Sequence, residues 1–533
     1  IDDGFQLNHP DLAANIYSNA VEDTPGLDKD GNGYTNDFRG WDFAGDDNNP
    51  SPGSTNDNHG TAVAGVAFAV ADNTIGIAGL ANRCKLLPVR VPVDAMASSD
   101  WVEAIDYAAG IADVISISLY IEVSDAVRNA LNRALVKGRG GKGCVILTAL
   151  GDDGVMRRYS SDLAASPQVV SVSGTSNFDR RWRRGDYGPA LSLVAPSAGG
   201  VGIYTTDRTG TDGYNTAAGG DYAYMEGTSL SSPIAAAAAA LLITKYPSWT
   251  GLQVRQMLEA ACDRIDATAY PYNIAGRNLQ YGHGRLNAFA ALVDSAPAWD
   301  PYEPDDLAAQ ATEIHDGEIQ YRSLATGADV DWARFTVSNK ADVCLTAVGT
   351  SNAFLRLYDS ATNEIVAVDR SALFPILTAW GMTNGTYFTR VESSNGVAVP
   401  GYGLHCGILN MKDSYETDNS TNNARLLLPR EMQYRTLYPT GDVDWAYFNL
   451  ATNARVDIST MGEWDGWLEL SLWRTNTMIG YSYRTNVAAL IVTQLQAGNY
   501  LVKVKEHDDY PLTSYQLLLE TYAADSGEDD GAT

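Results

Sequence analysis

Apolar residues follow two different patterns along the chain, and the pattern changes near residue 295. Before that point, continuous apolar runs such as VISIS, CVILTA and VVSVSG alternate with Ala-rich stretches. Continuous apolar runs are typical of strands buried on both faces of a parallel sheet, and Ala-rich stretches between them favour helices. The pattern predicts an α/β domain with a mainly parallel sheet over residues 1–294.

Beyond the α/β pattern, the segment SAPAWDPYEPDD begins at Ser295 and combines proline with acidic residues. It predicts a linker over residues 295–301. After it, apolar and polar positions alternate over short runs, with no long helical period. Alternation with a period of two indicates strands with one buried face, as in β-sandwiches or barrels.

The β-rich half contains an internal repeat. YEPDD at Tyr302 recurs as YETDN at Tyr415, ADVDWARF recurs as GDVDWAYF, and GTYFTRV recurs as GNYLVKV, each 113 residues further on. One constant offset for three matches indicates duplication of a single β-domain. We therefore predict two all-β sandwich domains, at 302–411 and 412–522, followed by an acidic tail at 523–533.

The composition narrows the class of partner. The formal net charge is −28 and the isoelectric point is about 4.5, which argues against binding to nucleic acid or to an anionic membrane surface. The longest apolar run, residues 234–243, is too short to cross a bilayer, so no membrane span is predicted. The charge suits salty or calcium-rich surroundings, and halophilic secretion and plain solubility explain it equally well.

The cysteines and the first residue add two expectations. None of the five cysteines has the spacing of a metal site, and Cys344 and Cys406 occur in the first repeat without counterparts in the second. The sequence leaves two alternatives for this pair: a disulfide bond between them, or two buried free thiols. The sequence starts at Ile1 with no signal peptide or pro-segment, which predicts a processed or truncated product.

Three motifs in the first domain carry residue types used in nucleophilic catalysis. IDDG places Asp2 at a strand end, NHGTAVAG places His59 at the start of an apolar helix, and GTSLSSP places Ser229 at the start of another. A serine nucleophile needs a histidine to take its proton and a carboxylate to orient that histidine. Each motif alone also fits an ordinary strand end, turn or helix cap. Together, they predict a catalytic triad.

These motifs, with GRGGKGCVILTALGDDG and GHGRLNA, resemble in order and spacing those of the subtilisin family, in its kexin or furin-like branch, over nearly all of residues 1–290. The resemblance implies a subtilisin-like catalytic domain and a secreted bacterial serine endopeptidase. Asp2 would orient His59, the general base, and Ser229 would form the acyl-enzyme. Protein or peptide substrates are implied, with a propeptide or inhibitor as a further partner. The two repeats resemble bacterial pre-peptidase C-terminal domains.

The resemblance also implies residues that bind substrate. In the kexin branch Asp3 contributes to a negative pocket for basic side chains, and Asp57 could add to its field. The segment SLYIEVSD, from Ser118, is expected to line the primary pocket, but Val123 stands where convertases carry an acidic residue. Glu122, Asp125 and Asp162 are candidates to compensate. A preference for basic residues and merely solvated carboxylates both stay open.

Two sets of oxygen ligands suggest structural calcium. The loop LDKDGNGYTND brings together Asp28, Asp30, Asn32 and Asp37 around a glycine turn, as EF-hand-like loops do, although an Asx-rich turn is the alternative. The resemblance implies a second site. Its side-chain and carbonyl ligands would come from Asp11, Asn73, Val70, Ile75 and Ile77.

The stretch TALGDDG places Asp152 where most relatives carry the asparagine that donates to the oxyanion. A protonated Asp152 could donate one O–H, which would tune the protease to mildly acidic pH. Alternatively, the enzyme is slower and relies on the Ser229 backbone N–H, or it is crippled. The rival to a protease is a catalytically weak surface-binding protein that acts through its tandem β-domains.

Overall fold

The computed structural model describes residues 1–533 apart from 23–25, 93–96, 158–161, 199–201, 218, 339–340, 368–374, 410–414, 438–441, 463–466, 486–488, 507–511 and 524–533. The chain divides into two compact units, Ile1–Ser338 with Asp342–Ile408, and Asn339–Ala341 with Leu409–Thr533. The first unit holds the α/β domain and one β-sandwich. The second holds the other sandwich.

A parallel sheet forms the centre of the α/β domain, as the sequence predicted. Its strand order is β3-β4-β5-β6, and every neighbouring pair is parallel. The strands are β3 (Val114–Ile117), β4 (Val145–Ala149), β5 (Val170–Thr175) and β6 (Leu193–Pro196). Most of their side chains are buried, because helices cover both faces of the sheet.

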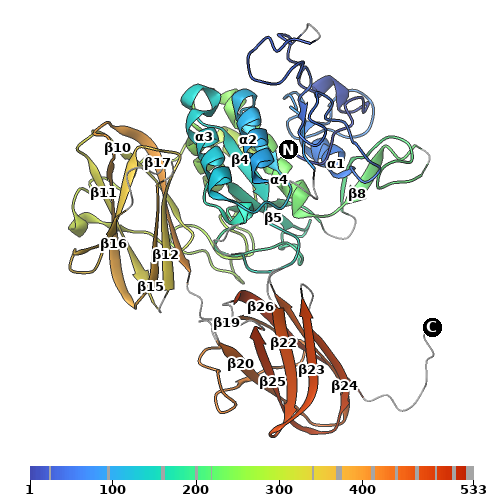
Figure 1. Ribbon diagram of the computed structural model, residues 1–533, viewed down its shortest axis with the longest axis vertical. Coiled ribbons are helices and arrows are strands. Elements are labelled where there is room, and N and C mark those ends of the chain that lie inside the picture. The colour runs from blue at the N-terminus through green and yellow to red at the C-terminus, as the bar shows by residue number, and fades with distance from the viewer. Residues whose placement is uncertain are drawn as a thin grey trace. The chain divides into compact units, whose positions relative to one another are not determined.

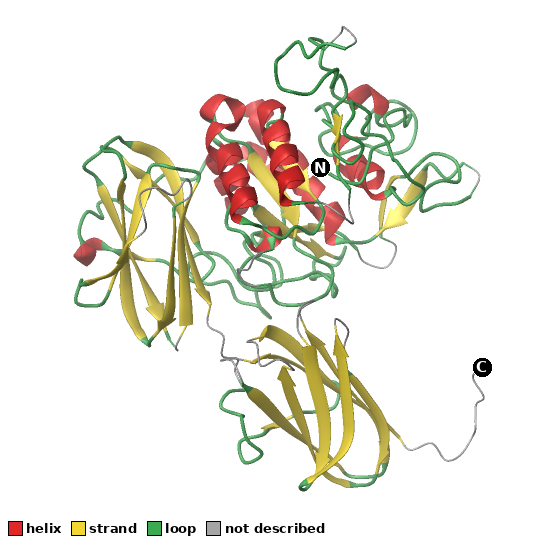
Figure 2. Cartoon of the chain, in the orientation of Figure 1, coloured by secondary structure: helices red, strands yellow, loops and turns green. Residues whose placement is uncertain are grey.

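The helices form the outer layers of this domain (Figures 1 and 2). One face of the sheet packs against α2 (Ser98–Ile111) and α3 (Asp125–Gly141). The other face packs against α4 (Thr228–Lys245), α5 (Gly251–Ala260) and α6 (Ala288–Val293). Smaller elements complete the domain: η1 (Ala13–Asn15), β1 (Trp41–Asp42), α1 (His59–Phe68), β2 (Val89–Arg90), η2 (Leu163–Ala165), β7 (Ile203–Thr206) and β8 (Tyr222–Met225).

Helix α4 is long and apolar enough to cross a membrane by length and composition alone, with a mean hydropathy of 1.2. Its surroundings give it another role. Of its residues, 67% are buried, and they pack against strands of the parallel sheet. A core helix passes the same test of hydropathy, so α4 is explained by its position inside the α/β domain.

The first β-sandwich has two antiparallel layers with one short parallel edge pair. Its sheets have the orders β10-β17-β12-β15 and β14-β13-β16-β11-β9. The elements are η3 (Ala308–Gln310), β9 (Thr312–Glu313), β10 (Ile319–Leu324), β11 (Val330–Val337), β12 (Ala341–Val348), β13 (Ala353–Tyr358), β14 (Glu364–Ala367), β15 (Ile376–Met382), β16 (Gly385–Ser393) and β17 (Val399–Leu409).

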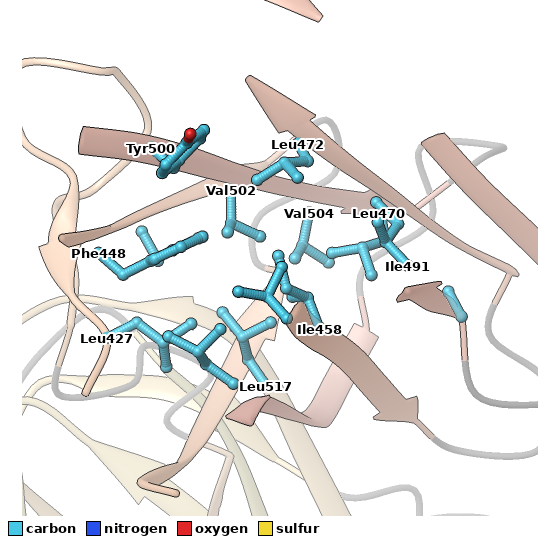
Figure 3. Packing of buried hydrophobic residues seen from close by; sticks show 14 of the residues in the cluster. Leu427, Phe448, Ile458, Leu470, Leu472, Ile491, Tyr500, Val502, Val504 and Leu517 are labelled. Carbon is cyan, nitrogen blue, oxygen red and sulfur yellow. The ribbon is translucent and has the colours of Figure 1, made fainter. Parts of the chain in front are cut away.

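The second sandwich repeats this topology strand for strand, as duplication requires. Its sheets have the orders β19-β26-β21-β24 and β18-β20-β25-β22-β23. Its strands are β18 (Arg425–Leu426), β19 (Met432–Leu437), β20 (Val443–Leu450), β21 (Ala454–Gly462), β22 (Trp467–Arg474), β23 (Thr477–Thr485), β24 (Leu490–Leu495), β25 (Gly498–Glu506) and β26 (Leu512–Ala523). Figure 3 shows Phe448 and Val502 of one sheet facing Ile458 and Leu517 of the other across its core.

The first sandwich packs directly on the α/β domain, which the sequence did not indicate. Tyr321 of β10 donates a hydrogen bond to the buried Glu259 of α5 at 2.6 Å. Leu252 of α5 joins Tyr321 and Val348 in one apolar cluster. These contacts explain why both domains fall into one compact unit. Cys344 and Cys406 are free thiols in this sandwich, so the disulfide considered from the sequence is absent.

Candidate active site

Asp2 and His59 meet at the start of helix α1. The Asp2 Oδ1 atom lies 2.7 Å from His59 Nδ1, and the Asp2 side chain is buried. Asp2 is positioned because it pairs with Arg90 in a parallel bridge beside β2, and its backbone N–H donates to the Val89 carbonyl. A buried carboxylate at hydrogen-bonding distance from Nδ1 leaves Nε2 available to accept a proton.

In this pair, the negative charge of Asp2 and the positive charge of a protonated His59 stabilise each other. Burial opposes the positive imidazolium, but the Asp2 carboxylate outweighs it, with smaller contributions from Asp3 and Asp152, and the pKa of His59 rises to about 9. Burial likewise opposes the charge on Asp2, and the attraction of His59 overcomes it, so the pKa of Asp2 falls below its usual value. The Asp2 carboxylate therefore stabilises the imidazolium that forms when His59 takes up a proton.

Ser229 is the second residue of α4. The helix begins after Gly227, whose φ of 146° and close contacts leave no room for a side chain. Ser229 Oγ donates to the Ser118 carbonyl oxygen at 3.4 Å, and Ser118 Oγ donates to the Ser229 carbonyl oxygen at 3.0 Å. Ser118 follows β3, so this predicted substrate residue and the nucleophile share the carboxyl end of the sheet.

Asp152 follows β4 and also reaches the start of α4. Its Oδ1 atom accepts hydrogen bonds from the Thr228 backbone N–H at 2.8 Å and from the Thr228 hydroxyl at 2.7 Å. A Cβ on Gly227 would lie 2.9 Å from Asp152 Oδ2, which explains the glycine. The structure therefore places Asp152 beside Gly227 and Thr228 at the start of α4, with Thr228 as its donor.

Asp3 has a role that the sequence analysis missed. Its buried carboxylate accepts hydrogen bonds from the backbone N–H groups of His59 at 3.0 Å and Gly60 at 2.7 Å. Burial and the neighbouring Asp2 raise the pKa of Asp3 to about 6. Asp3 thus caps helix α1 and fixes the backbone of His59. Its expected contribution to a pocket for basic side chains stays a prediction.

Asp57 is also engaged within the protein. It accepts hydrogen bonds from Arg90 at 2.8 Å and from the Ser54 hydroxyl at 2.6 Å. Arg90 also pairs with Asp42 at 2.6 Å, so Asp57 shares its cation with a second carboxylate. The contribution of Asp57 to a negative pocket stays a prediction. Glu122 is exposed and forms an isolated β-bridge with Asp162. Of the carboxylates predicted to bind substrate, Glu122 is the one that faces solvent.

The predicted calcium loop is compact, and it includes a residue that the sequence did not single out. Carboxylate oxygens of Glu22, Asp28 and Asp30 lie within 4.8 Å of one another. Asn32 donates to Asp37 Oδ2 at 2.9 Å, so these two predicted residues also meet, although Asp37 lies outside the close group. Glu22 is buried and accepts three backbone N–H groups of the loop. In the sequence, Glu22 is marked only by being a carboxylate that precedes the loop motif.

The second predicted calcium set also comes together. Asn73 Nδ2 donates to the buried Asp11 Oδ1 at 2.6 Å, and the Ile77 N–H donates to Asp11 Oδ2 at 2.9 Å. The loop between them has positive φ at Asp72, Thr74 and Gly76. Asp72 and Thr74 are strained there because they are not glycines, and such strain is common in loops shaped for a ligand. Val70 and Ile75 flank this loop, and the oxygen-rich donor set fits calcium.

The comparisons with known proteins identify the family of the α/β domain. The model of the subtilase family matches residues 1–284, more than half of the chain. The chain belongs to the subtilase family. The match covers the domain that contains Asp2, His59 and Ser229.

Relatives of this subtilase domain include named proteases. It is 36% identical to the calcium-dependent protease of Trichormus variabilis over 308 residues, covering 52% of this chain and 46% of the relative. It is 31% identical to thermitase of Thermoactinomyces vulgaris, covering 55% of this chain and 86% of thermitase. A solved structure of a protease from Pseudoalteromonas arctica is 25% identical to this chain, with a TM-score of 0.42. The match covers 55% of this chain and 87% of the solved one. The chain thus spans about half the length of the calcium-dependent protease.

Proposed function

We propose that this subtilase is a calcium-stabilised serine endopeptidase that is secreted and cleaves proteins through an acyl-enzyme on Ser229. The observation that carries the proposal is the 2.7 Å contact between buried Asp2 and His59, in a subtilase domain that places Ser229 at the start of α4. Protein or peptide substrates are its expected partners, with a propeptide or inhibitor as a further one. Membership of the kexin-like branch, which Asp3 suggested in the sequence, stays a prediction.

The proton transfers follow from this arrangement. The Ser229 hydroxyl turns from the Ser118 carbonyl toward His59 Nε2 when substrate binds, and it attacks the carbonyl carbon as His59 takes its proton. His59 then gives that proton to the leaving amine, and water repeats the sequence to release the acid. The Asp2 carboxylate stabilises the imidazolium in both steps.

Asp152 makes the oxyanion step unusual. The Ser229 backbone N–H at the start of α4 is one donor to the developing charge, whereas a carboxylate at position 152 offers no N–H. In the structure Oδ1 is occupied by Thr228, and Oδ2 is the oxygen that approaches Gly227. We infer that Oδ2 is the atom that must carry a proton for Asp152 to donate to the oxyanion.

Asp152→Asn is expected to raise kcat at neutral pH by about tenfold or more and to flatten its pH dependence, because one preformed donor is worth about 10² in rate. The asparagine Oδ1 can keep both Thr228 hydrogen bonds, so Nδ2 would stand where Oδ2 now lies. Steady-state kinetics from acidic to alkaline pH measure this. Asp153→Asn is the matched control, and a lower kcat for Asp152→Asn at every pH would contradict the argument.

Removal of calcium is expected to lower the melting temperature by roughly 10 °C in a Ser229→Ala background. A ligand at roughly 1,000 times its Kd contributes about 4 kcal/mol, and each kcal/mol is worth about 2–4 °C in domains of this size. Differential scanning calorimetry with and without EDTA measures the shift. Asp11→Asn should reproduce part of it, and Asp72→Asn, an exposed carboxylate of the same loop, should not. A melting temperature insensitive to EDTA would count against both peptidase calcium sites.

The preference for substrate side chains depends on Glu122. Since Asp3 and Asp57 are engaged within the protein, an attraction for basic residues would come from this exposed carboxylate. A cleavage profile on a peptide library, for the parent enzyme and for Glu122→Gln, measures that attraction.

A further inference from the structure

A buried polar network in the first β-sandwich has no part in the proposed peptidase chemistry. Arg322 of β10 is fully buried and forms an ion pair with Asp305. Gln320 Oε1 accepts two hydrogen bonds from its guanidinium, and the ring of Tyr302 lies over it at 4.4 Å. The network joins the segment that enters the sandwich to the strands of its sheets.

Next to Arg322 lies a group of carboxylates with unused oxygens. Oxygen atoms of Glu303, Asp305 and Asp331 lie within 4.8 Å of one another. Asp305 and Asp331 are each 1% exposed, and the Oδ1 atom of each is buried without a hydrogen-bond partner. Asp331 uses its other oxygen to accept from the Tyr402 hydroxyl at 2.5 Å. Buried carboxylate oxygens without partners are costly, so these atoms indicate a missing ligand.

The charge around these oxygens is not balanced. The negative charges of Asp300 and Asp329 act on the buried Asp331, whereas Arg322 and the Tyr402 hydroxyl act in the opposite direction. Glu303 feels the same two aspartates. The Arg322 guanidinium is already paired with Asp305, and it also acts on Asp331 and Glu303. A divalent cation would supply both the missing charge and the missing partner.

The second sandwich repeats the arginine, tyrosine and aspartate contacts 113 residues later, but Asp442, the counterpart of Asp329, replaces Asp418 in its carboxylate group. Carboxylate oxygens of Glu416, Asp442 and Asp444 lie within 4.8 Å of one another. Arg435 pairs with Asp418 beneath the ring of Tyr415, and the Tyr515 hydroxyl donates to Asp444 at 2.5 Å. The network is thus part of the duplicated unit, including its short tyrosine–aspartate contact.

We propose that each β-sandwich binds one divalent cation of the calcium class at this carboxylate group. Oxygens up to 4.8 Å apart can share one Ca²⁺, because two opposed Ca–O bonds of about 2.3–2.6 Å span that distance. Glu303 is exposed and gives the ion access from solvent. The ion ties the incoming segment, through Glu303 and Asp305, to Asp331 of β11. Calcium then orders the junction at the start of each sandwich.

Calcium stoichiometry in the full chain tests this proposal. Equilibrium dialysis is done in a Ser229→Ala background, so the result does not depend on peptidase activity. Asp331→Asn and Asp444→Asn should each lose one bound equivalent, and the double variant should lose two. Glu313→Gln, an exposed carboxylate on β9, should lose none. Asp11→Asn should remove a separate equivalent of bound calcium. A failure of the calcium site in the α/β domain can therefore be distinguished from a failure of the sites in the sandwiches.

Folding of each variant is checked by its melting temperature in EDTA, where the parent and the variant should agree. If Asp331→Asn unfolds, the exposed Glu303→Gln replaces it, and at least a tenfold weaker affinity for one equivalent is expected. Folded Asp331→Asn and Glu303→Gln proteins that bind the parent number of calcium ions with parent affinity would overturn the proposal for the first sandwich. Asp444→Asn decides the second in the same way.

Discussion

Ser229→Ala is expected to lower kcat for peptide hydrolysis by on the order of 10⁶, the loss known for a related subtilisin. The hydroxyl is the atom that would bond to the substrate, and no other group at the start of α4 can replace it. Activity that remains would come from substrate binding and from the backbone N–H that faces the oxyanion. Single-turnover kinetics with a chromogenic peptide measure the loss in kcat directly.

Two further variants show whether the loss belongs to the triad. His59→Ala should cost about as much as Ser229→Ala, and the double variant should cost no more, since the residues act as one unit. Ser231→Ala is the matched control, because the Ser231 hydroxyl donates to the Ala195 carbonyl within the core. A Ser229→Ala enzyme that keeps most of its activity would exclude the proposed nucleophile.

Asp2→Asn is expected to lower kcat by about 10⁴, because an amide favours the wrong tautomer of the histidine and cannot stabilise the imidazolium. The same change should move the pH profile. The Asp2 carboxylate raises the pKa of His59 to about 9, so its removal lets His59 lose its proton at lower pH. The acid limb of kcat/KM for the residual activity should therefore shift toward lower pH.

The stability of Asp2→Asn should change with pH in a matching way. A raised pKa of His59 stabilises the fold below the unfolded value of about 6.5, and this contribution disappears as pH rises through about 9. The variant should therefore be destabilised most below about pH 6.5 and should approach the parent as pH rises through about 9. Asp3→Asn is the comparison, since it loses a helix cap but keeps the triad. An unshifted acid limb in Asp2→Asn would contradict the proposed role of Asp2.

Much of the fold could be predicted because the signals are local. Continuous apolar runs became β3, β4 and β5, and the three motifs with Asp2, His59 and Ser229 lie at strand or helix ends where side chains can converge. The offset of 113 residues predicted two sandwiches, and their strand orders match throughout.

What could not be predicted depends on contacts between distant segments. Asp3 looks like a substrate residue in sequence, and its role as a helix cap depends on how closely the start of α1 approaches it. Glu22 joins the calcium loop only because the chain folds back on itself there. The ion-paired Glu259 gives no sign in sequence that Tyr321 of the first sandwich will bond to it.

Labelling of Ser229 by a fluorophosphonate probe tests the central claim most directly. The reagent reacts with a serine that is activated by its histidine, and it needs no knowledge of the natural substrate. The calcium-loaded protein should incorporate one probe per chain on Ser229, and Ser229→Ala should incorporate none. Absence of labelling from mildly acidic to mildly alkaline pH would contradict the account and favour a binding protein that acts through its tandem β-sandwiches.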